Sequence, residues 1–295
     1  MRVYTISDQD DSGPWIRKNF QAIFYILSPG YNYARATWLG MSFPFPGSNK
    51  EVVSNEWIAT NIQQGHGPLG AAYPDVAYGM EGDTPSFLGL ISNGLNDPEH
   101  PDYGGWGGRY TLYLPGFEDS NTGMFRRENW PKDEPETRAI WTNAEDSIVS
   151  PVDKKSYTGN AETIWRWRQE YQNDFEARIQ WTNKGFKQCN HPPVPRLGHS
   201  DHLTVKSGES FHLSAAGTTD PDGDSMSYLW FQYPEAGTYH GLVSFRPYSP
   251  NIYDLPVTAP LVDSARTIHF ILKVTDKGSP ALTRYRRVIV TVLPK

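Results

Sequence analysis

Cysteine is nearly absent from this chain of 295 residues, and long apolar segments are missing. Cys189 is the single cysteine, so neither an intrachain disulfide nor a cysteine-based metal site can form. No stretch approaches the about 18 apolar residues that are needed to cross a bilayer. Before residue 184 the only histidines are His66 and His100, and no Gly-x-Ser-x-Gly or His-Glu-x-x-His motif occurs. We therefore expect neither a Ser-His-Asp nor a zinc mechanism in that part of the chain.

Positive charge is also scarce in the N-terminal part. Residues 184–295 carry 12 Lys and Arg against 9 Asp and Glu, which leaves 15 against 24 in residues 1–183. An acidic domain repels phosphate backbones, so we expect no nucleic-acid partner. A neutral substrate or a bound cation fits this charge better.

The apolar pattern divides the chain into two domains. Residues 1–184 alternate short apolar strands with helix-like segments, which predicts an α/β domain, and nine of the ten tryptophans lie there. Residues 185–198 form a Pro-rich linker. Residues 199–295 show a period of two with Gly, Pro and Asp turns, which predicts an all-β immunoglobulin-like sandwich.

Several elements are predicted within the first domain. The first strand, residues 2–6, is expected to lie in the middle of a sheet, and a second strand follows at 22–27. Residues 96–160 are rich in Gly, Pro, Asp and Asn, which favours a long functional loop or lid. Helices are expected at 15–20, 55–64, 85–91 and 161–182.

Three carboxylates follow the first predicted strand, at the end where open α/β sheets bind ligands. Asp8, Asp10 and Asp11 occur within four residues. They cannot all remain ionised in a dry pocket without a counter-charge, which Ca²⁺ or the hydroxyl groups of a sugar would supply. A solvated acidic turn before a helix is the alternative interpretation.

A second acidic pair precedes the helix predicted to begin at Pro85. Glu81 and Asp83 flank Gly82, where the backbone can approach a ligand. We expect Asp83 to bind a metal or a hydroxyl group and Glu81 to hydrogen-bond the substrate. A helix N-terminus favours carboxylates whatever their task, so a structural role also remains open.

Two further segments could bind ligands. Glycines surround Trp106, which could stack on a sugar or base with Arg109 beside it, or could lie buried in a tight loop. The run Asp220–Asp224 resembles half a calcium loop but lacks the glutamate that completes an EF-hand. Its simplest interpretation is a turn between two strands, with calcium binding as the alternative.

A set of segments shares one resemblance. They are Val3–Arg17, Ser54–Trp57, Met80–Leu88, Gly104–Tyr110, Thr163–Arg168 and Ala215–Trp230. Together they resemble the nucleoside-hydrolase-like proteins often labelled cellulose-binding. The resemblance implies a Rossmann-like hydrolase domain followed by an immunoglobulin-like or cadherin-like domain. In nucleoside hydrolases the Asp-rich run that holds Ca²⁺ ends the first strand of the N-terminal half, so the resemblance implies that this half is lacking here.

The activity implied by the resemblance is hydrolysis of an N-glycosidic or related glycosidic bond. Ca²⁺ would hold the ribose diol and a water molecule, and an aspartate would take the proton of that water. The metal ligands would be Asp8, Asp10 and Asp83, and no catalytic residue is assigned. The substrate would contact Glu81, Asn55, Glu56, Trp106 and Arg109. Loss of the early Asp run would leave the chain inactive by itself.

Two other functions remain open. In the first, the protein binds a carbohydrate such as cellulose through its aromatic side chains and hydrolyses nothing. In the second, the immunoglobulin-like domain serves as a spacer or an adhesion unit. In each case we expect a nucleoside or carbohydrate ligand and no membrane partner. The family suggests an exported protein, although residues 1–8 do not read as a signal peptide.

Overall fold

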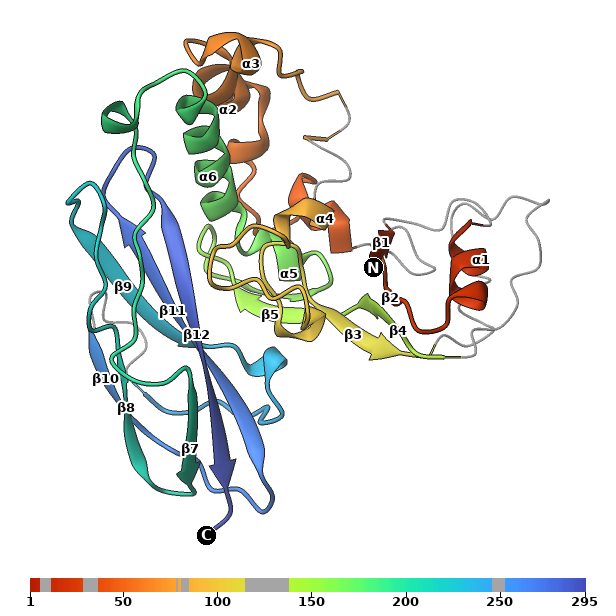
Figure 1. The fold of residues 1–295 in the computed structure, drawn as a ribbon, viewed down its shortest axis with the longest axis vertical. Helices are drawn as coiled ribbons and strands as arrows, with labels where there is room; N and C mark the ends of the chain where they lie inside the picture. The colour runs from red at the N-terminus through yellow and green to blue at the C-terminus, as the bar shows by residue number, and fades with distance from the viewer. Residues whose placement is uncertain (6–11, 29–36, 78, 81–84, 115–137, 246–252) are drawn as a thin grey trace. The chain divides into compact units, whose positions relative to one another are not determined.

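The computed structural model divides into two compact units (Figure 1). It describes residues 1–5, 12–28, 37–77, 79–80, 85–114, 138–245 and 253–295. The first unit comprises Met1–Ile58, Pro74–Ile91 and Asn96–Gln169. The second comprises Ala59–Tyr73, Ser92–Leu95 and Glu170–Lys295. None of the described helices is long and apolar enough to span a bilayer.

A mixed four-stranded sheet forms the frame of the first unit. Its order is β1 (Arg2–Thr5), β2 (Phe24–Leu27), β4 (Ile140–Asn143) and β3 (Tyr110–Tyr113). β1 runs parallel to β2, β2 runs parallel to β4, and β3 runs antiparallel to β4. Tyr25 and Leu27 of β2 and Ile140 of β4 form one buried cluster on this sheet. The parallel pairing places the carboxyl ends of β1 and β2 side by side.

Two expectations for the first unit are wrong. β1 lies at the edge of the described sheet and not in its middle. The stretch 96–160, expected to be irregular, contains β3, β4 and a hairpin of β5 (Asp146–Val149) with β6 (Ser156–Gly159). Each of these strands has four residues, too few for the alternation of apolar side chains to stand out from a Gly-rich background.

The described helices of the first unit are short. They are α1 (Ser12–Asn19), η2 (Thr37–Met41), η3 (Glu51–Val53), α2 (Asn55–Ile58), α4 (Pro85–Leu88), η5 (Pro101–Tyr103) and α5 (Glu162–Trp165). The buried side chain of Arg168 fixes the backbone from η2 to the start of η3. Its guanidinium donates to the carbonyl oxygens of Gly40 (2.7 Å), Phe43 (2.9 Å) and Asn49 (3.0 Å). One cation thus satisfies backbone acceptors that regular secondary structure does not reach.

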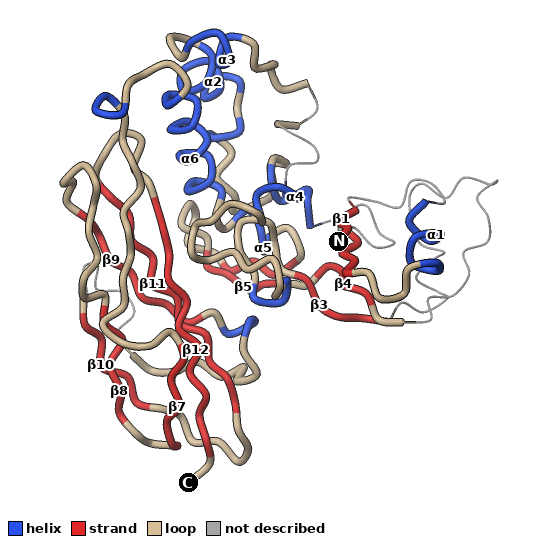
Figure 2. Tube along the Cα trace, in the orientation of Figure 1, coloured by secondary structure: helices blue, strands red, loops and turns tan. Residues whose placement is uncertain are grey.

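The second unit has two sheets around one hydrophobic core (Figure 2). One sheet has the order β7 (His202–Lys206), β12 (Thr283–Leu293), β11 (Arg266–Asp276) and β9 (Met226–Gln232). The other pairs β10 (Asp254–Thr258) with β8 (Ser210–Ser214). Alternating burial along β8, β10 and β12 confirms the period of two, and Trp230, Phe270 and Val288 lie in the core.

The clearest helix of the sequence contains a break. The predicted helix 161–182 forms α5 and then α6 (Arg168–Trp181), and from Glu170 onward α6 belongs to the second unit. Asn173 donates to the carbonyl of Ala281 at 2.8 Å, and Asp174 pairs with Arg284 at 2.9 Å. These contacts join α6 to the β11–β12 pair. The predicted boundaries after residues 184 and 198 remain predictions.

The remaining helical segments of the second unit are also short. They are η4 (Ala59–Gln63), α3 (Gly67–Ala71), η7 (Phe186–Gln188) and η8 (Pro234–Ala236). The predicted helix 55–64 corresponds to α2 followed directly by η4, which has π-helical geometry.

Candidate functional site

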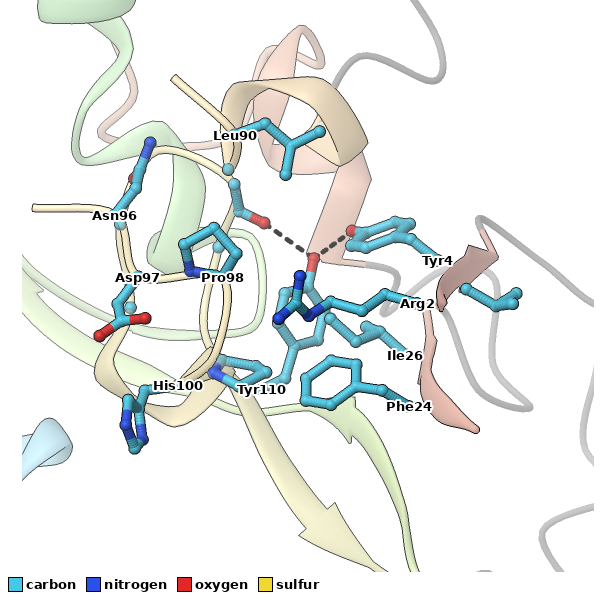
Figure 3. Close-up of a pocket in the computed structure, with 17 residues that line it drawn as sticks. Arg2, Tyr4, Phe24, Ile26, Leu90, Asn96, Asp97, Pro98, His100 and Tyr110 are labelled. Atoms are coloured by element: carbon cyan, nitrogen blue, oxygen red, sulfur yellow. Dashed lines mark hydrogen bonds between the residues drawn. The ribbon is translucent and has the colours of Figure 1, made fainter. Parts of the chain in front are cut away.

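A cavity of about 190 Å³ opens beside β1 in the first unit (Figure 3). The residues that line it come from β1, β2, the end of α4 and the segment 96–110. They are Arg2, Val3, Tyr4, Phe24, Ile26, Gly89, Leu90, Asn96, Asp97, Pro98, His100, Pro101, Gly104, Gly105, Gly107, Gly108 and Tyr110. Residues from four parts of the sequence therefore meet at one cavity.

Two tyrosines supply the buried polar groups of this cavity. The hydroxyl of Tyr4 bonds to the hydroxyl of Tyr110, which donates to the carbonyl of Gly107 at 2.8 Å (Figure 3). Their rings meet edge to face, with centroids 5.7 Å apart. Burial raises the pKa of both phenols above the ordinary tyrosine value. Both hydroxyls are consequently neutral at physiological pH, and this pair offers hydrogen bonds without charge.

The walls of the cavity are mainly apolar, and their charged side chains include the exposed Arg2 and the half-buried Asp97. Phe24, Ile26 and Leu90 form apolar parts of the lining, and Leu90 keeps 68 % of its surface exposed. The guanidinium of Arg2 lies 5.8 Å from the ring centre of Phe24 and pairs with Glu99. Apolar walls with a few fixed polar groups are typical of sites that bind small molecules.

The Gly-rich segment brings its backbone to the cavity. A side chain at Gly105 would place its Cβ 2.2 Å from Asn96 Oδ1, so only glycine fits there. Asn96 fixes this segment in turn. Its Oδ1 accepts from the backbone N–H of Trp106 at 2.8 Å, and its Nδ2 donates to the carbonyls of Leu88 and Ile91 at 2.7 and 2.9 Å. Asn96 thereby holds the end of α4 against the glycines.

Trp106 and Arg109 do not present their side chains to the cavity. Trp106 has no exposed surface. Of the two alternatives, an indole that stacks on a ligand or one buried in a tight loop, the structure shows the second. The Nε of Arg109 donates to Asp146 Oδ1 at 2.7 Å, and Asp146 Oδ2 accepts from Arg166 at 2.9 Å. The flanking glycines allow the chain to turn the indole inward, because they leave room around the backbone.

Asn55 and Glu56 also lie away from the cavity lining. The Oδ1 of Asn55 accepts from the backbone N–H of Val76 at 2.7 Å, which joins the start of α2 to the chain after α3. Glu56 is exposed in the first turn of α2. Neither residue lines the cavity, so their predicted contact with substrate gains no support from its geometry.

The predicted metal ligands Asp8, Asp10 and Asp83, together with Glu81, lie outside the described residues. Asp8 and Asp10 follow β1 in the sequence, and Asp83 precedes α4. Both β1 and the residues just after α4 line the cavity. The calcium site therefore stays a prediction.

Sequence reasoning missed Tyr4, Tyr110 and Asn96 as lining residues. The β propensity of Tyr4 predicts only a place in the first strand, and Tyr110 stands at the end of the Gly-rich motif. A useful signal was present in the paired glycines around Trp106, since they mark where a backbone must approach another group closely. The sequence alone could not show that the tryptophan would turn away from the cavity and leave the glycines facing it.

Comparison with known proteins identifies the class of the fold. A nucleoside hydrolase-related hypothetical protein from Saccharophagus degradans, associated with carbohydrate metabolism, is 32 % identical, with a TM-score of 0.74 over 99 % of this chain. The chain spans 62 % of the length of that protein. The fold is therefore nucleoside-hydrolase-related, with mixed sheets and a C-terminal region rich in β-sheet.

Family models match both ends of the chain. Residues 1–110 match the nucleoside hydrolase-like domain of cellulose-binding Sde182, and residues 210–292 match the C-terminal domain of cellulose-binding protein Sde0182. Two models of this family thus match the chain, one toward each end, and the resemblance read from the sequence to nucleoside-hydrolase-like, cellulose-binding proteins is confirmed.

Other comparisons add nothing to this assignment. A search of curated proteins found no match. A 2,6-sialyltransferase from Photobacterium sp. JT-ISH-224 is 16 % identical over 32 % of this chain and 17 % of its own, with a TM-score of 0.23. Three N-terminal domains of the bacteriophage RB49 outer capsid protein Hoc are 13 % identical over 34 % of this chain and 30 % of theirs, with a TM-score of 0.21. Neither similarity is strong enough to carry an argument.

Proposed function

We propose that the first unit binds an uncharged, sugar-containing ligand, a carbohydrate or a nucleoside, in the cavity beside β1. The observation that carries this proposal is the neutral Tyr4–Tyr110 pair set among apolar walls. A sugar offers hydroxyl groups to such a pair and C–H faces to apolar side chains such as Phe24. The acidic balance of residues 1–183 disfavours phosphorylated ligands.

The family description supports the same ligand class. The matching family model is named for cellulose binding and for nucleoside hydrolases, and both names refer to sugar-containing molecules. The buried position of Trp106 argues against a flat platform at that residue, so the ligand would enter a pocket and not lie across an exposed indole.

Hydrolysis of an N-glycosidic bond is the second candidate function. It is supported by the sequence order, since the predicted ligands Asp8 and Asp10 follow β1, which lines the cavity, and by the family resemblance. Ca²⁺ bound there would lower the pKa of a coordinated water and hold the sugar diol. No reaction step through the ion follows from the described residues.

Blocking the cavity tests the binding proposal. Leu90→Trp adds bulk at its exposed rim, and we expect it to weaken binding of cellobiose or adenosine at least about tenfold, measured by isothermal titration calorimetry. Leu112→Trp is the matched control, because Leu112 is also an exposed leucine (56 %) but does not line the cavity. Equal affinities for both variants, or no binding by the wild-type chain, would overturn the proposal.

Hydrolysis is tested separately from binding. Release of the free base from adenosine is followed by chromatography for the wild-type chain and for Asp8→Asn, with Ca²⁺ present. If the chain hydrolyses its ligand, Asp8→Asn should abolish base release while binding survives. Binding without any base release would leave the carbohydrate-binding function and exclude the hydrolase function for this chain.

We also propose that residues 199–295 form an immunoglobulin-like domain that acts as a spacer or adhesion unit. Support comes from the two sheets around one core and from the long antiparallel pair β11–β12. If this is correct, residues 199–295 should not bind cellulose by themselves. A pull-down on insoluble cellulose compares the retention of that fragment with that of the full chain.

A further inference from the structure

Three aspartates of the second unit meet in the turn that precedes β9. One carboxylate oxygen from each of Asp220, Asp222 and Asp224 lies within 4.8 Å of the others. The turn is folded around Asp220, whose Oδ1 accepts from the backbone N–H of Asp222 at 2.9 Å and of Asp224 at 3.0 Å. Acidic turns of this kind are common on protein surfaces, so the cluster alone does not indicate an ion.

A fourth aspartate, Asp276 at the end of β11, provides an independent observation. It has no exposed surface. Its Oδ1 accepts from Asn190 Nδ2 (3.1 Å) and from the backbone N–H groups of Gly278 (3.0 Å) and Leu282 (2.9 Å). Its Oδ2 is buried without any hydrogen-bond partner. A buried carboxylate oxygen with no donor is costly, and native proteins rarely leave one so.

Two more oxygens share this condition. Asn190 Oδ1 and Asp220 Oδ2 are likewise buried and have no hydrogen-bond partner. With Asp220 and Asp276 ionised, all three atoms are acceptors and cannot satisfy one another. Among the described residues, no lysine or arginine forms an ion pair with Asp220, Asp224 or Asp276. The region therefore contains several oxygens that lack both a proton donor and a counter-charge.

Contacts between these residues bring them to one place. Asn190 donates to Asp276, and the next residue, His191, donates its backbone N–H to Asp222 Oδ2 at 2.7 Å. In the pairing of β11 with β9, Asp276 lies opposite Met226, which stands two residues after Asp224. The segment 190–191, the acidic turn and the end of β11 thus converge on one negatively charged position.

We propose that this position binds a Ca²⁺ ion through Asp220, Asp222, Asp224 and Asp276, with Asn190 Oδ1 as a further ligand. The donor set consists of oxygens alone, which suits a hard cation, and carboxylate and amide oxygens are what Ca²⁺ takes in its shell of 6–8 ligands. Mg²⁺ requires a smaller octahedral shell and gives up its water reluctantly, so this carboxylate-rich set favours Ca²⁺.

The fourth carboxylate explains how half a calcium loop can be sufficient. The run Asp220–Asp224 lacks the glutamate that completes an EF-hand loop. The fold supplies Asp276, at the end of β11, in its place. The ion would join Asn190, the turn before β9 and the end of β11. We therefore expect Ca²⁺ to stabilise the second unit against unfolding, as any ligand of the native state does.

Titration of the full chain with Ca²⁺ alone, after removal of metals, tests the proposal. We expect binding with a dissociation constant between about 10⁻⁶ and 10⁻³ M, the range of calcium sites from sensors to weak modules. Asp224→Asn should weaken this binding at least about tenfold. Among the described residues its carboxylate accepts no hydrogen bond, so the variant should fold normally, and circular dichroism checks this.

Two control variants locate the ion. Asp263→Asn removes an exposed aspartate of the same unit, and Asp8→Asn alters the separate site predicted in the first domain. Both should retain the Ca²⁺-binding event that Asp224→Asn loses, and both should keep the Ca²⁺-dependent rise in the melting temperature of the second unit. Unchanged Ca²⁺ binding by Asp224→Asn, or Mg²⁺ binding as tight as that of Ca²⁺, would overturn the proposal.

Discussion

Asp146 in the first unit and Asp276 in the second are both fully buried aspartates, but their surroundings are opposite. Asp146 lies between two guanidinium groups, with Arg109 Nε at 2.7 Å and Arg166 Nη1 at 2.9 Å. Asp276 receives hydrogen bonds from an amide and two backbone N–H groups, and the charge that acts on it is the negative one of Asp220.

This difference separates a structural carboxylate from a candidate ligand. A buried carboxylate is stable when hydrogen bonds and opposite charge compensate its lost hydration. Asp146 has both, so it needs nothing from outside the chain. Asp276 has hydrogen bonds on one oxygen and no counter-charge, so an added cation would complete its surroundings. Burial of an acidic residue is therefore informative only together with what surrounds it.

The largest effect is expected from Asp146→Asn. Loss of its charge leaves Arg109 and Arg166 facing each other in the interior, and breaking a buried ion pair typically costs about 3–5 kcal/mol. Urea unfolding followed by tryptophan fluorescence measures the loss, because most of the tryptophans lie in the first unit. Asp153→Asn, an exposed aspartate of the same unit, is the control. A loss as small as that of the control would mean that Asp146 does not hold the two arginines together.

A much smaller effect is expected from Asp276→Asn when metals are removed by a chelator. Asparagine keeps an oxygen for the three donors and removes an uncompensated negative charge, so the free energy of unfolding should change by no more than about 1 kcal/mol. Urea unfolding by circular dichroism measures it. With Ca²⁺ added, only the wild-type chain should gain stability. A loss of the size expected for Asp146→Asn would show that a cation from the protein already neutralises Asp276.

The smallest effect concerns the pH dependence of the first unit. Burial raises the pKa of Glu162 in α5, and the charges of Asp146 and Glu145 raise it further. Its protonated form is therefore favoured by folding. The stability that it contributes is complete below the ordinary pKa of 4.5 and is lost as pH rises through the raised pKa. The free energy of unfolding, measured at several pH values across this window, should vary less with pH in Glu162→Gln than in the wild-type chain. The same slope in both proteins would contradict the prediction.

Parts of the fold could be predicted because local sequence patterns determine them. The period of two in residues 199–295 predicts the strands of that region, and β8 and β12 show it, while the apolar runs predict β1 and β2. The four-residue strands β3 to β6 and strand β10 carry too little local signal, because their pairing partners, and not their own composition, stabilise them. The family was also accessible, since its motifs lie in continuous segments.

The candidate sites were less predictable for a related reason. The glycines around Trp106 marked a close approach of the backbone, but only the contact with Asn96 shows what is approached. Arg109 was assigned to substrate on the strength of its neighbour, whereas a distant aspartate takes its guanidinium. Side chains that are adjacent in a loop can point in opposite directions, and a linear motif does not contain that information.

By itself, the sequence of this protein determined the period of its C-terminal strands, the acidic character of its first part and the presence of three aspartates in the turn before β9. Only the tertiary structure decided that Tyr4 and Tyr110 share a cavity and that the end of β11, with Asp276, lies beside the turn that holds Asp220. Both pairings link residues more than fifty positions apart. Such contacts depend on the packing of whole sheets, while turn chemistry and strand period depend on neighbours along the chain.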